Sequence, residues 1–363
     1  MRTLVVSDLH LGSRTRTELL LRPEAQEQLL DAVSQCDRLV LLGDLLELRQ
    51  GPQWEAFDVA RPVLAQIGAT LPPDSEIVMV PGNHDHRLLR GWFDRRGPRA
   101  TPLGLATEVD WHADELLGVL IACLGARMVR VSYPGVWLRE DVYAIHGHYG
   151  DRHTVVPILE RLGAGVNSLL LGEEAAQPAR AEDYEATLAP MYAWIDTIAQ
   201  AQPAERGRAR GGMQARTWRR LSGSDRSRLR RAAVGAAFSA MIAALNRGGV
   251  GPLRPQLSDA HLRQGALRGF GEVLARLQVD ARHVISGHTH RAGPLPGDQQ
   301  PEWLSPTGAR MVNTGSWVHE PDLIGEHPWS SPYRPGFCAW LEDGAPPELR
   351  CLLDSSPGVM NSL

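Results

Sequence analysis

The residues "VMVPGNHDHRLL", at positions 78–89, combine a strand pattern with a chemically reactive turn. An apolar run typical of a buried strand ends at a Pro-Gly break, and positions 83–86 then hold Asn, His, Asp and His. Such side chains bind metals or transfer protons, but a polar turn of this kind also occurs in ordinary loops. For this turn alone both interpretations are open.

Four other apolar runs end in the same kinds of residue. Beyond their ends stand Asp8 with His10, Asp44, His146 with His148, and His288 with His290. In an extended chain, side chains two residues apart lie on the same face, so we expect each pair to point into one space. Sites in open α/β sheets form in the crevice beyond the carboxyl ends of the strands. The five motifs together therefore predict one site.

The composition is typical of a soluble globular protein without a strong electrostatic preference for a partner. The 363 residues are 43% hydrophobic and 22% charged, and all 38 basic residues are arginines. A formal net charge of −4 gives no general attraction to nucleic acid or to anionic membranes.

Several features favour a cytoplasmic protein. The four cysteines are scattered without a C-x-x-C pair, which argues against a disulfide framework or a thiolate zinc site. The apolar run at 3–6 leads directly into Ser7 and Asp8, which leaves no room for a leader sequence. The longest uncharged apolar stretch, 232–245, is too short to span a bilayer as a helix.

Strand and helix patterns alternate along the chain, which predicts an α/β fold with a largely buried sheet. Helices are expected at 23–36, 54–68 and 259–278, and strands at 3–6, 38–44, 76–80, 128–133, 142–148, 283–286, 311–314 and 337–342. Between these parts, helical patterns stand at 155–162, 184–200 and 229–247. We predict a core formed by residues 1–150 and 259–363, interrupted by a helical insertion at 151–258.

The side chains of the five motifs form a ligand set of carboxylates, imidazoles and one amide, without sulfur. Such a set suits manganese, iron, zinc or cobalt rather than calcium, which prefers oxygen alone. The motifs hold more ligands than one metal ion requires, and a shared carboxylate bridges two ions about 3.5–4 Å apart. A pair of metals activates water and binds phosphate oxygens, so the expected reaction is hydrolysis of a phosphoester.

The series of motifs resembles the calcineurin-like metallophosphoesterase superfamily. The matching elements stand in the family's order: Asp8-x-His10, Gly43-Asp44, Gly82-Asn83-His84-Asp85, His146 and Gly287-His288-Thr289-His290. They cover about residues 1–150 and 265–320. The resemblance implies a four-layer αββα sandwich, in which two sheets are flanked by helices, with the insertion as a cap.

The resemblance also implies a role for each position, with two ions of manganese, iron or zinc. The first metal is expected to be held by Asp8, His10 and His290, the second by Asn83, His146 and His288, and Asp44 is expected to bridge them. His84 is expected to contact the scissile phosphate and protonate the leaving oxygen, and Glu47 to orient His84.

Other polar residues of the motifs have two interpretations each. His148 either reaches the metals or the substrate, or packs behind the ligands. Asp85 is expected to cap a helix or accept hydrogen bonds near the ligands. Arg87, Arg152 and Arg291 follow the motifs closely; we favour solvated surface arginines over phosphate contacts. The candidate substrate-binding residues are Asn83, His84, His148 and Arg87.

The substrate has more than one interpretation. The segments "GDLLE" and "HGH" most resemble bacterial relatives of UDP-2,3-diacylglucosamine pyrophosphatase, which implies a lipid-linked substrate. That subgroup usually has Arg where this chain has His84, and the histidine fits the wider phosphodiesterases and phosphatases better. A monoester, a diester and a pyrophosphate all stay open, as does the oligomeric state.

The insertion holds an arginine-rich segment, 204–247. One interpretation is a cap that contacts an anionic substrate and rests on the inner face of the membrane, but we favour a solvated arginine face. Nucleic acid is a further alternative, and the sparse aromatics, Trp218 and Phe238, count against it. A non-catalytic scaffold is also disfavoured, because every ligand position is filled.

Overall fold

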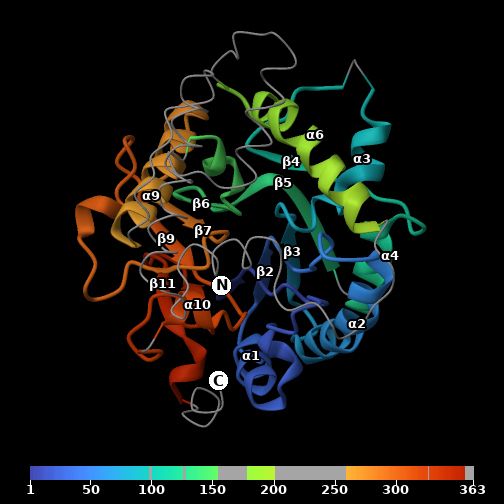
Figure 1. The fold of residues 1–363 in the computed structure, drawn as a ribbon, viewed down its shortest axis with the longest axis horizontal. Helices are drawn as coiled ribbons and strands as arrows, with labels where there is room; N and C mark the ends of the chain where they lie inside the picture. The colour runs from blue at the N-terminus through green and yellow to red at the C-terminus, as the bar shows by residue number, and fades with distance from the viewer. Residues whose placement is uncertain (98–99, 126–127, 154–177, 201–258, 326, 356–363) are drawn as a thin grey trace, which may run out of the picture.

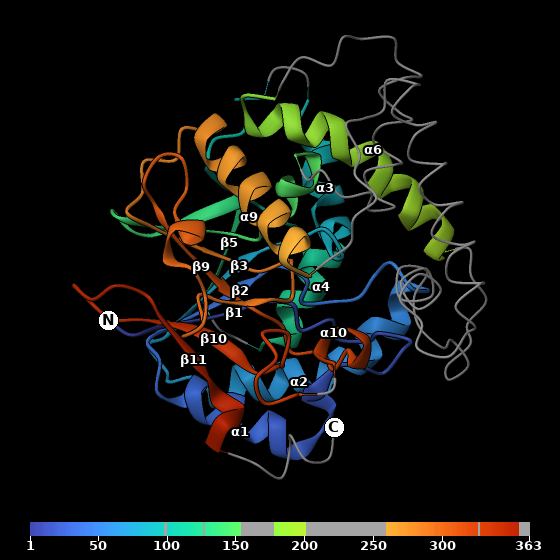
Figure 2. The same ribbon diagram turned by 60° about the vertical axis from the view of Figure 1, so that its left-hand side comes forward.

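The computed structural model describes residues 1–97, 100–125, 128–153, 178–200, 259–325 and 327–355. The fold is a mixed α/β arrangement with one large sheet of eleven strands and several helices, as the alternation of patterns predicted. Figure 1 shows the sheet at the centre of the molecule. Helices α1 (Pro23–Ser34) and α2 (Gln53–Thr70) lie on one side of the strands, and α6 (Ala181–Gln200) and α9 (Asp259–Arg276) lie on the other (Figure 2).

The first half of the sheet carries the N-terminal motifs. Strands β1, β2 and β3 pair in parallel in this order, and β10 and β11 extend the sheet with antiparallel pairs beyond β1. All these strands except β11 were predicted. They are β1 (Thr3–Val6), β2 (Arg38–Leu42), β3 (Glu76–Val80), β10 (Phe337–Leu341) and β11 (Glu348–Cys351).

The second half carries the histidine motifs. Strand β6 pairs in parallel with β7, which pairs in parallel with β9, and the short β8 closes this edge. The strands are β6 (Val142–Ile145), β7 (His283–Ser286), β8 (Ala292–Gly293) and β9 (Arg310–Thr314). The sequence predicted β6, β7 and β9, but not β8.

A single long strand, β5 (Met128–Arg139), joins the two halves. Its first part pairs in parallel with β3, and its last part pairs antiparallel with β6. The prediction of a strand that stops at 133 is wrong, because the strand continues through Pro134 and Gly135. Pro134 lies beyond Val131, the last residue paired with β3, so its missing N–H interrupts no bond to that strand. The short β4 (Ala106–Glu108) pairs alongside.

Both faces of the central strands β1, β2, β3, β6, β7, β9 and β10 are buried, which explains why these strands read as continuous apolar runs. Alternate residues from the two halves pack into one cluster, formed by Val5, Val40, Leu42, Val78, Val80, Val136, Leu138, Val142, Ala144, Ile285, Val312, Ala339 and Leu341. The intervening residues, such as Leu39 and Leu41, belong to a larger cluster that includes the apolar faces of the helices. The strand ends are thereby held in fixed relative positions.

The long helices agree with the predictions. They are α1 (Pro23–Ser34), α2 (Gln53–Thr70) and α9 (Asp259–Arg276). Proline at the first position of α1 needs no hydrogen-bond partner for its nitrogen. The sequence did not predict α3 (Arg90–Arg95), α4 (Leu116–Cys123) or α10 (Pro321–Ile324). Among the described helices, none is both long and apolar enough to cross a membrane.

Part of the predicted insertion is described. Its helix α6 (Ala181–Gln200) contains the pattern predicted at 184–200. The end of α6 contacts the core, because the backbone N–H of Gln53 donates to Gln200 at 2.9 Å. The helical patterns at 155–162 and 229–247 lie outside the described residues. The division of the chain at 151 and 258 stays a prediction.

The cluster shared by the two halves generates a stability prediction. Ile285 is fully buried in it, so Ile285→Ala should lower the free energy of unfolding by about 2–5 kcal/mol through lost burial and a residual cavity. Met128→Ala is the control, since Met128 is 65% exposed and its truncation should cost about 0.5 kcal/mol or less. Urea unfolding followed by circular dichroism measures both. Equal stability of the two variants would contradict the packing described.

Candidate metal centre

The predicted ligands converge at the carboxyl ends of five strands. Asp8 follows β1, Asp44 follows β2, Asn83 follows β3, His146 follows β6, and His288 follows β7. Ligand atoms within 4.8 Å of one another form three groups: Asp8, His10 and His290; His10, Asp44 and His84; and Asp44, His146 and His288. The structure therefore brings together residues that the sequence separates by up to 282 positions.

The backbone at these ligands differs from the extended conformation that we predicted. Positive φ angles occur at Asp8 (55°), His10 (45°), Asp44 (53°), His288 (71°) and His290 (58°). The pairs Asp8/His10 and His288/His290 point into one space because the backbone turns at these residues, not because it is extended. The left-handed region costs about 1–3 kcal/mol for each non-glycine residue, and such residues concentrate at functional sites.

Glycines before the ligands let the loops approach closely. A Cβ atom at Gly43 would collide with the ring of His146, and one at Gly287 would collide with the side chains of Ser7 and Asp8. The Gly-Asp and Gly-His pairs of the motifs are thus required by contact with a ligand from another strand.

Around Asp8, hydrogen bonds fix which ring atoms face inward. Nδ1 of His290 lies 2.8 Å from a carboxylate oxygen of Glu320, so it carries the hydrogen and donates. Its Nε2 then faces Nε2 of His10 at 3.0 Å and Oδ1 of Asp8 at 3.4 Å. The second oxygen of Asp8 accepts from the backbone N–H of His288 at 2.9 Å and from Ser7. Three electron-pair donors therefore face one space.

Around Asp44, the same arrangement recurs. Nδ1 of His146 donates to the carbonyl of Leu42 at 2.9 Å, which leaves Nε2 facing Oδ2 of Asp44 and the amide of Asn83, each at 3.1 Å. Nε2 of His288 lies 2.9 Å from Asp151, which leaves Nδ1 facing the same amide at 3.1 Å.

These donor atoms fit metal ions. Electron pairs that face one another at about 3 Å repel unless a positive charge lies between them. One proton can lie between only one pair of electron-pair donors. In this site, nitrogen and oxygen atoms from several residues face the same space. The oxygen and nitrogen set without sulfur suits manganese, iron or zinc.

Buried carboxylates make the field at the site negative. Burial alone lowers the pKa of His146, but the charges of Asp44 and Asp8 outweigh it and raise this pKa to about 9. Burial also lowers the pKa of His290, and Glu320 with Asp8 raises it to about 10. The carboxylates that hold protons on these rings equally attract a metal cation. Metal binding therefore competes with protons and weakens as the pH falls.

His84 lies beside the ligands with its ring fixed by Glu47. Its Nδ1 lies 2.8 Å from the Glu47 carboxylate, and its ring centre is 4.6 Å from that of His10. Burial raises the pKa of Glu47, but its interactions with the neighbouring His84 and His10 rings outweigh burial and the net pKa is lowered. The contact predicted between His84 and Glu47 is present in the structure.

Asp85 ties two of the ligand loops together. Its carboxylate accepts hydrogen bonds from the backbone N–H groups of Leu45 and Gly82, both at 2.7 Å. It makes no capping bond to the short helix η2 (His86–Leu89) that follows. Of the two roles predicted for Asp85, the structure thus supports the acceptor near the ligands.

His148 is buried beside the ligands. Its Nε2 lies 3.2 Å from the hydroxyl of Tyr133, which itself donates to Glu185 of α6. Its ring centre is 5.6 Å from that of His146, and its Nδ1 has no hydrogen-bond partner among the described residues. Its predicted substrate contact stays a prediction.

The three arginines of the motifs are less solvated than expected. Arg291 is buried and forms a bidentate pair with Asp298, so the prediction of a surface arginine is wrong there. Arg152 is half-buried. Arg87 donates to Gln53 at 2.8 Å and pairs with Asp196 of α6. Arg87 therefore faces the helix, and its substrate contact stays a prediction.

Sequence reasoning missed the residues that orient the ligands. Glu320 holds His290 and Asp151 holds His288, and neither belongs to a metal-binding motif. Asp151 stands three residues after His148. Its closeness in sequence to a histidine motif was a signal that could have identified it. Glu320 had no such signal. Asn313, within "VNTGSW", donates to the carbonyl of Gly287 at 2.6 Å and supports the last motif.

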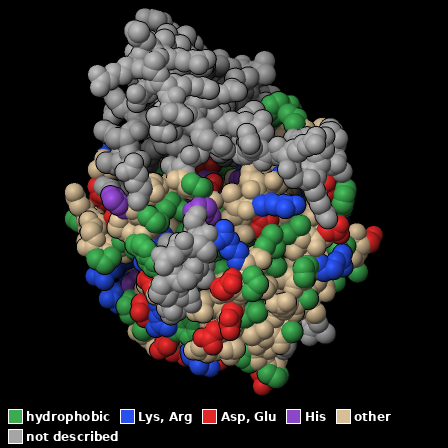
Figure 3. Space-filling view, turned by 60° about the horizontal axis from the view of Figure 1, so that its bottom comes forward, with side chains coloured by type: hydrophobic (Ala, Val, Ile, Leu, Met, Phe, Trp, Pro, Cys, Tyr) green, Lys and Arg blue, Asp and Glu red, His purple; other side chains and the backbone are tan. Residues whose placement is uncertain are grey.

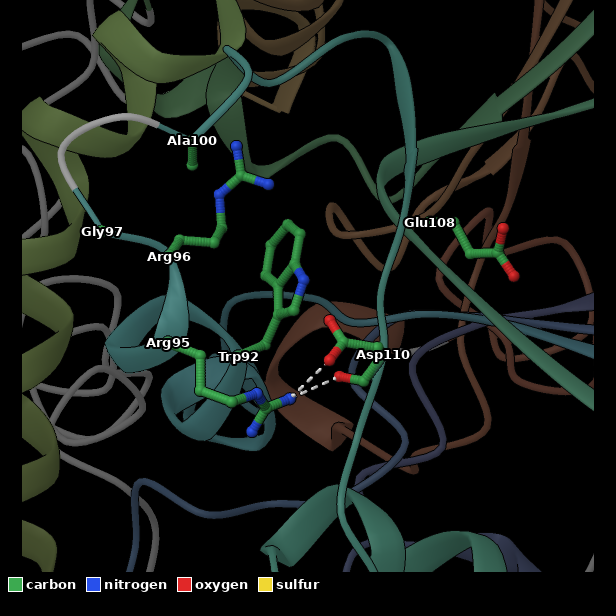
Figure 4. Close-up of a pocket in the computed structure, with 7 residues that line it drawn as sticks. All are labelled: Trp92, Arg95, Arg96, Gly97, Ala100, Glu108 and Asp110. Atoms are coloured by element: carbon green, nitrogen blue, oxygen red, sulfur yellow. Dashed lines mark hydrogen bonds and ion pairs between the residues drawn. The ribbon is translucent and has the colours of Figure 1, made fainter.

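A cavity of about 1000 Å³ lies elsewhere, beside α3. Figure 4 shows Trp92, Arg95 and Asp110 among its lining residues, and none of the predicted site residues belongs to it. Arg95 donates to the carbonyl and the carboxylate of Asp110 at 2.9 and 3.2 Å. Its charge is thus already compensated, and the cavity adds nothing to the chemistry at the strand ends.

Comparison with known proteins agrees with this geometry. A family model described as calcineurin-like phosphoesterase matches residues 1–181, which hold Asp8, His10, Asp44, Asn83, His84 and His146. The chain belongs to the calcineurin-like phosphoesterase family. It is a metal-dependent phosphoesterase. No curated protein sequence matches it.

Two solved structures that are similar to this calcineurin-like phosphoesterase resemble it only remotely. A cold-active protein-tyrosine phosphatase of a psychrophilic Shewanella species is 12% identical, with 94% of this chain and 75% of that chain covered and a TM-score of 0.29. A dimetal phosphatase from Danio rerio is also 12% identical, with 94% and 93% covered and a TM-score of 0.33. Likeness at this level does not establish a common site.

The contact between Glu320 and His290 generates a prediction about metal affinity. Glu320→Ala should weaken metal binding about 10- to 100-fold, because the ring loses the partner that fixes its orientation. Glu348→Ala is a matched control, since that carboxylate is exposed and pairs with Arg350. Competition between the protein and a chromogenic chelator measures the affinity. Unchanged affinity in Glu320→Ala would contradict the orienting role.

Proposed function

We propose that this protein hydrolyses a phosphoester at a centre of two metal ions. The first ion would be held by Asp8, His10 and His290 and the second by Asn83, His146 and His288, and Asp44 would be shared between them. The observation that carries the proposal is the position of Asp44 Oδ2, which lies 3.1 Å from Nε2 of His146 and 3.8 Å from Nε2 of His10. One oxygen thus stands between the two groups of ligands.

The metal ions and the residues beside them have different roles in the proposed reaction. When bound, manganese, iron or zinc ions lower the pKa of water and neutralise charge on the phosphate. His84 is the general acid: Glu47 holds its Nδ1–H, and its side chain is 20% exposed beside the ligands. The backbone N–H of His84 also donates to Oδ1 of Asp44 at 2.8 Å, which fixes the acid relative to the bridging ligand.

We also propose the four-layer αββα arrangement for the core and a capping role for the insertion. Strand β5 belongs to both halves of the sheet, and the two halves share an apolar cluster. Both observations support an arrangement of two packed sheets. Two contacts of α6 with residues next to the site support the cap: His86 lies 2.9 Å from Glu185, and Arg87 pairs with Asp196.

We propose a phosphorylated small molecule as the substrate, in the cytoplasm, where the four free cysteines are compatible with a reducing compartment. The lipid-linked alternative rests on the resemblance of "GDLLE" and "HGH". The membrane-bound and nucleic-acid alternatives depend on the segment 204–247, which lies outside the described residues. On the face shown in Figure 3, acidic and basic side chains of the described residues are interspersed, so this face offers no basic patch for nucleic acid. A scaffold without activity is disfavoured, because all seven ligands are present.

The bridging position of Asp44 generates a prediction about activity. The purified protein should contain manganese, iron or zinc and hydrolyse p-nitrophenyl phosphate or its bis ester, and a chelator should abolish this activity. Asp44→Asn and His288→Ala should each abolish turnover because a shared or terminal ligand is lost. Asp354→Asn, at an exposed carboxylate, is the control. Full turnover in either ligand variant would refute the metal assignment.

The contact between His84 and Glu47 generates a second prediction. His84→Ala should keep its metal content, measured by elemental mass spectrometry, and lose about 10²- to 10⁴-fold in kcat. Glu47→Gln should lose less, because the acid remains and only its orientation weakens. The exposed His112 supplies the control His112→Ala. A loss of metal from His84→Ala would instead make His84 a ligand.

A further inference from the structure

A buried carboxylate of helix α6 accepts hydrogen bonds from three parts of the core. Glu185 is buried, although it belongs to the predicted insertion. One of its carboxylate oxygens lies 2.9 Å from Nε2 of His86, and the other accepts from the hydroxyl of Tyr149 at 2.7 Å and from that of Tyr133. Because buried donors need a partner, this carboxylate fixes where its three neighbours lie.

The three contacts are those of an ionised carboxylate. Burial raises the pKa of Glu185, but its interactions with the His86 ring and the two tyrosine hydroxyls outweigh burial, and the net pKa is lowered. Burial and the charge of Glu185 raise the pKa of Tyr133 and of Tyr149, so both hydroxyls keep their hydrogens and stay donors. Hydrogen bonds to an ionised group are stronger than those between neutral groups.

The first contact leads to Asn83. His86 stands three residues after Asn83 and two after the proposed acid His84. The ring of His86 also lies against α6, with its centre 5.1 Å from that of Tyr192. The hydrogen bond to Glu185 therefore fixes the end of the loop that carries Asn83.

The second contact leads to His146. Tyr133 donates its hydroxyl hydrogen to Glu185, so its oxygen accepts from Nε2 of His148 at 3.2 Å. His148 is buried, and its ring centre lies 5.6 Å from that of His146. The hydrogen bonds that start at Glu185 thus fix the ring that packs behind a ligand.

The third contact leads to His288. Tyr149 and Asp151 belong to the same short helix, η3 (His148–Arg152). Tyr149 donates to Glu185, while Asp151 lies 2.9 Å from Nε2 of His288. Helix α6 therefore holds the segment that orients His288.

The three contacts share one property, because each leads to a ligand proposed for the second metal ion. His290, a ligand proposed for the first ion, is oriented instead by Glu320. We propose that Glu185 is a positioning residue for the second metal ion, so that helix α6 is part of the metal centre and not only a cover over it. The inference rests on the proposed function and assigns to the insertion a role in metal binding.

The proposal predicts a selective loss of one metal ion. Cobalt(II) added to the metal-free, full-length protein should fill two sites, measured by titration calorimetry and by the visible absorption of bound cobalt. Glu185→Leu should weaken one site about 10- to 100-fold, because its ligands lose the contacts that orient them. Glu185→Gln keeps an oxygen that accepts from both tyrosines, so it should restore most of this affinity. Glu272→Leu, at a 43% exposed carboxylate of α9, is the control.

Two ligand variants identify the ion that is lost. In a His288→Ala background only the first site remains, and adding Glu185→Leu should leave its cobalt affinity unchanged. In a His290→Ala background the second site remains, and the same addition should weaken it about 10- to 100-fold. A role of Glu185 in stability alone would lower both affinities alike, and that result would overturn the proposal.

Tyr149→Phe tests the same link with a smaller change. It removes only the hydroxyl that joins η3 to Glu185, so it should weaken the second site about tenfold, the loss of a hydrogen bond to a charged group. Tyr143→Phe is the matched control, since this buried hydroxyl donates to the carbonyl of Leu105 at 2.6 Å. Should Glu185→Leu not fold, unchanged cobalt affinity in Tyr149→Phe overturns the proposal.

The outcomes separate this inference from the proposed function. If the unaltered protein takes up no cobalt and cleaves no phosphoester, the proposed function fails. If it does both, and Glu185→Leu keeps two sites of unchanged affinity, the role of Glu185 alone is overturned.

Discussion

Parallel pairing of neighbouring strands is the constraint on which the metal centre depends. Because β1 pairs with β2 and β2 with β3 in register, Asp8, Asp44 and Asn83 emerge at one edge of the sheet. Parallel pairing of β6 with β7 does the same for His146 and His288. The apolar cluster between the two halves holds these edges together, so burial of hydrocarbon sets the separation of the ligands.

The structure places several electron-pair donors close to one another, and this placement costs free energy. Five predicted ligands lie in left-handed backbone conformations, and three histidines, of which His146 is buried, have their outer nitrogens fixed by Leu42, Asp151 and Glu320. These features cost free energy in the absence of a cation, since they strain the backbone and bring like charges together. A fold that carries such costs at one edge is organised for binding rather than for its own stability.

The sequence was sufficient to predict the strands that carry the site, because a parallel sheet buried on both faces leaves unbroken apolar runs that end in polar residues. The sequence was insufficient to predict the backbone conformation at Asp8 and His288. The two-residue spacing suggested an extended chain there, but both residues have positive φ angles. Glu320 was missed because its contact with His290 is set by packing between separate segments. The continuation of β5 through Pro134 was missed because proline usually ends a strand.

The long strand β5 has a consequence for the relation between metal and folding. The proposed ligands on one side of it belong to the first half of the sheet and those on the other side to the second, so each proposed ion would link the two halves. Metal coordination would then stabilise the contact between the halves as well as supply chemistry. The thermal stability of the protein would in that case depend on the supply of metal ions.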